Sequence, residues 1–92
     1  MLYMNIITWD PPQRDAVVKR FTTMGLGLPA KFKLLGIWGD VCGGRMFQLV
    51  DTGDVRDPKV SFQTNYAWND LCKIESIGVM APEEMVKNIP SK

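Results

Sequence analysis

The stretch that decides the fold is GIWGDVCGGRMFQLVDT, residues 36–52, in which two apolar segments flank a pair of glycines. Both segments are rich in branched and aromatic side chains, which fit the pleated surface of a sheet. Gly43 and Gly44 can both adopt the positive φ angles that a two-residue type I′ turn requires. The sequence therefore predicts a hairpin of two strands, residues 33–42 and 45–52.

Both faces of this hairpin are expected to be apolar. A two-residue loop pairs Trp38 with Leu49 and Ile37 with Val50. The strands then present Leu34, Trp38, Phe47 and Leu49 on one face, and Leu35, Ile37, Met46, Gln48 and Val50 on the other. Strands that are apolar on both faces are typical of a sheet that is covered on both faces.

The segments around the hairpin predict the rest of the fold. Residues 2–9 and 71–80 are expected to form the first and last strands. One helix is predicted to start at Asp10 and another at Asp57, because an Asp at the N-cap followed by proline is a typical helix start. A short final helix is predicted from Pro82. The resulting β-α-β-β-α-β order is the α+β, ferredoxin-like arrangement, with a four-stranded antiparallel sheet.

Each of the two main helices is expected to cover the same face of the sheet. The first should end at Gly25 and bury Val17, Phe21 and Met24, which follow the helical period. The second should run past Trp68 and bury that side chain. The other face of the sheet is then left without a cover, and we expect a second copy of the chain to pack on it, giving a homodimer.

Composition restricts the classes of function. The 92 residues suit one domain, residues 1–92, and their formal net charge is only +1. Lys and Arg are scattered, so no nucleic-acid partner is expected. The chain has neither a secretory signal nor an apolar run of about 18 residues that would span a membrane, so a cytoplasmic location without membrane attachment is predicted.

No metal or other cofactor is expected. The chain has no histidine, and histidine is the commonest general base and metal ligand. Its two cysteines, Cys42 and Cys72, are too few for a structural zinc site.

Several short motifs resemble the DUF3303 family of small uncharacterised proteins, within the dimeric α/β-barrel superfamily. The motifs are Met1–Met4, Trp38, Arg45–Leu49 and Trp68–Leu71, and the resemblance covers most of the chain, with departures around residues 25–33 and 52–62. It implies a dimeric α/β barrel, and it implies little about activity, since a fold alone does not determine function.

Four residues are candidates for a ligand-binding site: Asn5, Gln48, Tyr66 and Trp68. Asn5 is an amide within an apolar strand, and a buried amide must form hydrogen bonds. In superfamily members that are cofactor-independent monooxygenases, a first-strand Asn and a second-helix Trp line a pocket, and the resemblance places Asn5 and Trp68 comparably. The alternative is structural: a hydrogen-bonded amide at Asn5, core packing at Trp68 and a cross-strand bond from Gln48.

Two functions therefore remain open. The first is a homodimeric protein that binds a small apolar ligand. The second is a monooxygenase-like enzyme acting on a small aromatic or apolar substrate, in which Asn5 orients the substrate and Tyr66 and Trp68 wall the pocket. A closed interface between sheet and helices would favour the first, and an open apolar cavity containing Asn5 would favour the second.

Overall fold

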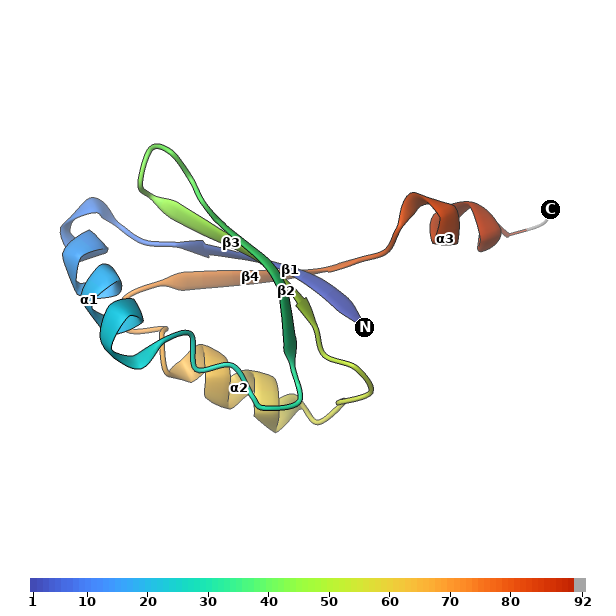
Figure 1. The fold of residues 1–92 in the computed structure, drawn as a ribbon, viewed down its shortest axis with the longest axis horizontal. Coiled ribbons are helices and arrows are strands. Elements are labelled where there is room, and N and C mark those ends of the chain that lie inside the picture. The colour runs from blue at the N-terminus through green and yellow to red at the C-terminus, as the bar shows by residue number, and fades with distance from the viewer. Residues whose placement is uncertain (91–92) are drawn as a thin grey trace.

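The computed structural model describes residues 1–90, which form an antiparallel sheet with two helices along one side and a third helix that projects beyond the sheet (Figure 1). The order of elements confirms the predicted α+β, ferredoxin-like fold. The elements are β1 (Leu2–Thr8), a 3₁₀ turn (Pro11–Gln13), α1 (Arg14–Met24), β2 (Lys33–Gly39), β3 (Arg45–Asp51), α2 (Pro58–Tyr66), β4 (Lys73–Val79) and α3 (Pro82–Lys87).

The four strands lie in the order β2-β3-β1-β4, so β1 and β3 are central. Asn5 in the middle of β1 pairs with Gln48 on β3 and with Ser76 on β4. Since paired residues point to the same face, these three polar side chains form one row across the sheet. They lie on the face that the helices cover.

The buried core lies between this face and the helices. Its buried apolar members are Val50, Val17, Cys72 and Trp68, each 9% exposed or less, as predicted for Val17 and Trp68. The prediction for Met24 is wrong, because its side chain is 75% exposed. The reason is that α1 ends there, and Gly25, at φ 70°, turns the chain so that the residues after it approach the sheet instead.

The turn of the hairpin differs from the predicted two-residue turn. β2 ends at Gly39, the backbone N–H of Asp40 donates to the carbonyl of Arg45 at 2.9 Å, and this bond closes a loop of residues 41–44. The Asp40 carboxylate accepts a hydrogen bond from the backbone N–H of Cys42 at 3.0 Å, and the Asp40 carbonyl accepts one from Gly43 at 2.8 Å. Only Gly43 of the two central glycines has a positive φ. A turn held by hydrogen bonds from the following backbone to Asp40 thus takes the place of the predicted type I′ turn.

The register of the hairpin shifts accordingly. Trp38 pairs with Phe47, so the predicted pairing with Leu49 is wrong. A shift of two residues keeps most side chains on their predicted faces, because the period of a strand is two. Leu34 is the exception, since a bulge follows it and pairs it with Val50, on the opposite face from Trp38.

The two Asp-Pro helix starts behave differently. The Asp57 carboxylate accepts a hydrogen bond from the backbone N–H of Lys59 at 3.0 Å, which confirms the predicted N-cap. Asp10 makes no such side-chain bond, so that prediction is wrong. Pro12 is two residues after Asp10, as Lys59 is two residues after Asp57, but a proline has no backbone N–H to donate. The next N–H, that of Gln13, donates to the backbone carbonyl of Asp10 at 2.8 Å.

This difference predicts unequal effects of the same substitution. Asp57→Ala should lower the free energy of unfolding by about 1 kcal/mol, the usual value of an N-cap hydrogen bond. Asp10→Ala, the matched control, should change it by much less, because no cap bond is lost. Urea denaturation of the two variants measures both values, and an equal loss in both would contradict the assignment of the caps.

The second face of the sheet, which we call the open face, carries no helix in residues 1–90 (Figure 1). Trp38 on this face is 54% exposed. Its indole lies over Gly36, where a β-carbon would stand 2.9 Å from the ring atom Cζ2. The apolar side chains of the open face are Leu2, Met4, Ile6, Trp38, Phe47, Leu49, Ile77 and Val79.

Candidate functional site

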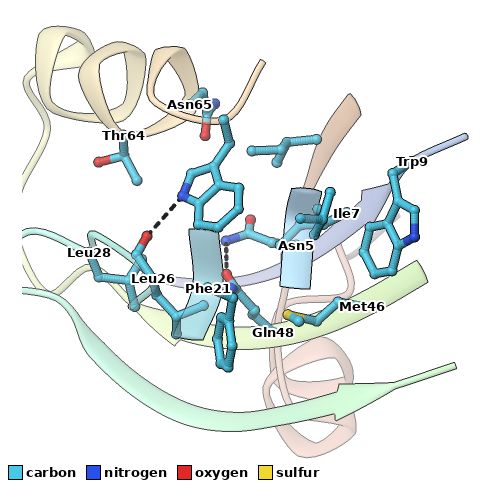
Figure 2. Close-up of a pocket in the computed structure, with 13 residues that line it drawn as sticks. Asn5, Ile7, Trp9, Phe21, Leu26, Leu28, Met46, Gln48, Thr64 and Asn65 are labelled. Carbon is cyan, nitrogen blue, oxygen red and sulfur yellow. Dashed lines mark hydrogen bonds between the residues drawn. The ribbon is translucent and has the colours of Figure 1, made fainter. Parts of the chain in front are cut away.

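A small cavity, which we call the inner cavity, lies between the covered face of the sheet and the two helices (Figure 2). Its volume is about 40 Å³. The wall is mostly aliphatic and aromatic, and it includes three side-chain amides, those of Asn5, Gln48 and Asn65.

The polar row of the sheet forms part of this wall. The Ser76 hydroxyl donates to Asn5 Oδ1 at 2.8 Å, and Asn5 Nδ2 donates to Gln48 Oε1 across a long 3.5 Å contact. Figure 2 shows the side chains of Asn5 and Gln48 pointing toward each other. Gln48 is only 5% exposed, and its amide nitrogen makes no hydrogen bond within residues 1–90. The row therefore ends in a donor without a partner.

A second unpaired donor lies at one end of the inner cavity. Trp9 lines the cavity (Figure 2), and its indole N–H is enclosed without a hydrogen-bond partner among the described residues. An unsatisfied buried polar group costs about 1–3 kcal/mol. Two N–H donors of residues that line the cavity thus lack partners in the described part of the chain, and of these the Trp9 N–H is the enclosed one.

The Trp68 indole forms a fixed wall of the inner cavity. Its N–H donates to the carbonyl of Leu26 at 3.1 Å, and the Arg20 guanidinium lies 5.6 Å from the ring centroid. Arg20 itself is held by two bonds to the Asp70 carboxylate, at 2.6 and 2.8 Å, and by one to the carbonyl of Ala67 at 2.9 Å. The pair joins α1 to the turn that carries Trp68.

The Arg20–Asp70 pair also shifts the titration of both groups. The hydrogen bonds from Arg20 hold the pKa of the Asp70 carboxyl below its usual value, and Asp70 raises the pKa of Arg20. Burial raises the pKa of the neighbouring Cys72 thiol. Because the pKa of Asp70 is lower in the folded state, the pair stabilises the fold above the unfolded-state pKa of about 4 and loses this effect as the pH falls through the folded-state value.

Asp70→Asn should therefore lower the melting temperature at pH 7 and lower it less as the pH falls below 4. The difference between the variant and the unchanged protein should approach zero once Asp70 is protonated. Thermal melts from pH 7 to pH 2 measure this difference. Asp15→Asn, which alters a carboxylate with a 91% exposed side chain, is the control, and its melting temperature should stay close to that of the unchanged protein.

A wider groove continues from the inner cavity. This outer groove has a volume of about 380 Å³ and shares Asn5, Leu28, Thr64 and Asn65 with the inner cavity. Its remaining wall is richer in hydroxyl groups. The hydroxyl-bearing residues that it does not share are Tyr3, Thr52, Ser61 and Ser76. We refer to the inner cavity and the outer groove together as the cleft.

The structure brings together three of the four predicted site residues. Asn5, Gln48 and Trp68 all line the inner cavity. Tyr66 does not line the cleft; it is 65% exposed and packs against Phe62, with ring centroids 5.7 Å apart. The expectation that α2 runs past Trp68 is wrong, because the helix ends at Tyr66 and a turn carries Trp68 inward.

Several cleft residues were not predicted from the sequence. Ser76 joins the row only because β4 pairs with β1 in the observed register. Leu26 and Leu28 enter the inner cavity from the segment after Gly25, which has no periodic pattern. Thr64 follows the helical spacing from Val60, and that spacing was the one signal that pointed it toward the sheet.

Comparison with known families identifies the chain. A family described as a domain of unknown function, DUF3303, has a model that matches residues 1–92. The chain belongs to this family. No curated protein and no solved structure matches it. Membership of DUF3303 thus agrees with the predicted resemblance and assigns no activity to the cleft.

Two further findings on this DUF3303 chain concern membranes and metal ions. No helix within residues 1–90 has the length and apolar character needed to cross a membrane. The same residues contain no group of three or more Cys, Asp or Glu side chains arranged to hold a metal ion.

Proposed function

We propose that this DUF3303 protein binds a small, partly apolar molecule in the cleft and acts as a homodimer. The observation that supports binding is the amide nitrogen of Gln48, which has no hydrogen-bond partner among residues 1–90 and lies in a mostly apolar wall. A nitrogen of this kind is a hydrogen-bond donor. The complementary ligand therefore carries an acceptor, such as a carbonyl oxygen, beside an apolar ring or chain.

The energetics favour a ligand at this position. The row of Ser76, Asn5 and Gln48 places three polar side chains on the covered face of a sheet, where apolar residues would pack without unpaired groups. The Gln48 amide nitrogen borders the inner cavity, and a donor that is closed off from water without a partner costs about 1–3 kcal/mol. An acceptor from a ligand removes that cost, and specificity in small-molecule sites usually comes from a few such polar groups in an apolar wall.

The size of the cleft sets the size of the ligand. At about 40 Å³ the inner cavity holds little more than a water molecule or a methyl-sized group. The outer groove, at about 380 Å³, falls within the range of roughly 300–1,000 Å³ that is typical of small-molecule sites. We therefore place the acceptor end of the ligand beside Asn5 and Gln48 and the rest of it in the groove.

Two probe compounds of nearly equal shape test this proposal. 1-Tetralone carries a carbonyl oxygen that tetralin lacks, so 1-tetralone should raise the melting temperature more, since a bound ligand stabilises the folded state. One hydrogen bond contributes about 1 kcal/mol, which corresponds to about fivefold in affinity. Gln48→Leu should remove most of the difference between the compounds.

The controls separate this site from general binding. Tyr66→Phe, outside the cleft, should leave the preference for 1-tetralone unchanged. Equal shifts with the two compounds in the unchanged protein would contradict an acceptor site at Gln48. Loss of the preference in Tyr66→Phe would place the compound elsewhere.

The monooxygenase-like enzyme is the second candidate, favoured by the position of Asn5 and Trp68 on the same inner cavity. It would use Asn5 to orient a phenolic substrate and Trp68 as a wall. It predicts that the protein consumes dissolved oxygen in the presence of such a substrate, which an oxygen electrode measures.

The homodimer would form through the open face. Eight apolar side chains lie there, and no element of residues 1–90 covers them. Charged residues lie toward its margins, with Lys73 and Glu75 on the edge strand β4. An apolar centre with a polar rim is the usual anatomy of a protein interface, and the two-fold packing of identical faces is the commonest form of assembly.

A further inference from the structure

The chain ends in a segment that packs on nothing else in residues 1–90. This segment, which we call the arm, is residues 80–90 and contains α3. In Figure 1 the arm leaves the end of β4 and places α3 beyond the sheet, away from α1 and α2. Every residue of the arm is exposed, and Met85, Val86 and Ile89 are between 57% and 68% exposed.

The arm accounts for the elongated shape of the molecule. A compact domain of 92 residues has an expected radius of gyration of about 12 Å, and the observed value is 15.0 Å. The longest dimension is 51 Å, against 29 and 19 Å for the other two. Ala81, with extended backbone angles of −63° and 146°, carries the chain outward before α3 begins.

α3 is too short to be stable without a packing partner. It has six residues, and isolated helices shorter than about 12–15 residues are marginal in water. The helix dipole interacts favourably with Glu83 and Glu84 in the first turn and with Lys87 in the last turn. Each such charge contributes only about 0.3–1 kcal/mol to the stability of the helix. The helix therefore needs a surface for the apolar side formed by Met85, Val86 and Ile89.

The β2 edge of the open face provides a matching unoccupied surface. Trp38 is the most exposed apolar side chain of β2, at 54%, and Phe47 on β3 pairs with it on the same face. The arm cannot easily reach them within its own chain, because β2 and β4 are the opposite edges of the sheet. Three strand spacings, about 14 Å, separate the two edges, and the arm runs outward.

We propose that two copies of the chain exchange arms, so that Met85, Val86 and Ile89 of each copy pack on Trp38 and Phe47 of the other. The proposal rests on the proposed homodimer and adds the arm to its interface. Each copy carries one arm and one apolar surface that have no partner in residues 1–90. Two identical chains can cover both arms and both surfaces, because each arm packs on the surface of the other copy. A different protein would need to supply both a surface for the arm and a cover for Trp38. Exchange of a terminal element is a common way to build a dimer.

Mass measurement by light scattering after gel filtration tests the arm. The unchanged chain should have about twice the 10.4 kDa mass of one copy at micromolar concentration. Met85→Asp combined with Val86→Asp should weaken the dimer at least tenfold, because two charges would be buried against Trp38. Lys87→Glu alters the net charge by the same amount on the polar side of α3, and this control should leave the dimer intact.

The outcomes separate the arm from the dimer itself. A monomeric unchanged chain would overturn both proposals. If the double variant dimerises as tightly as the unchanged chain while Trp38→Lys is monomeric, the dimer forms through the open face and the arm exchange is wrong. Loss of the dimer in both variants, with Lys87→Glu unaffected, supports the exchange.

Paramagnetic broadening in mixed samples shows where the arm packs. Chains with Cys42→Ser and a spin label on Asn88→Cys are mixed with ¹⁵N-labelled chains that carry no label. The label should broaden the indole N–H signal of Trp38 in the ¹⁵N-labelled copy, and a label on Lys19→Cys, on α1, should not. An unaffected Trp38 signal with the Asn88 label would overturn the placement of the arm.

Discussion

The pairing of β1 with both of its neighbours is the constraint on which the rest of the structure depends. It sets Asn5 opposite Gln48 on one side and Ser76 on the other. A slip of one residue in either pairing would move a polar side chain to the open face and an apolar one toward the helices. The row across the sheet, the inner cavity and the apolar character of the open face all follow from this one register.

Sequence reasoning worked where the signal is local. Alternation within the strands and the Asp57-Pro58 helix start define the elements and their order without knowledge of the partners. It failed at Asp40, where a side chain competes with the backbone for the hydrogen bonds of the turn. It failed also at Asp10, where a second proline removes the donor that a cap requires. Both failures concern single hydrogen bonds, which residue propensities do not describe because they are averages over many positions.

The candidate site shows a similar division. Asn5 and Gln48 were predicted because an amide within an apolar segment stands out in the sequence, and Trp68 was predicted because the family resemblance placed it in the same pocket as Asn5. Tyr66 was predicted to wall the pocket together with Trp68, but α2 ends between them and the two rings point to different surroundings. The outer groove is formed by chain segments far apart in sequence, so its shape and its hydroxyl groups required the assembled fold.

The bulge after Leu34 has a consequence for how the sheet meets other chains. An edge strand with a regular row of free N–H and C=O groups invites another strand to add, which leads to open-ended aggregation. The bulge interrupts that row on β2, and Lys73 and Glu75 place charges along β4 at the opposite edge. Both edges thus resist the addition of a strand, which leaves the face of the sheet as the surface through which the proposed homodimer would form.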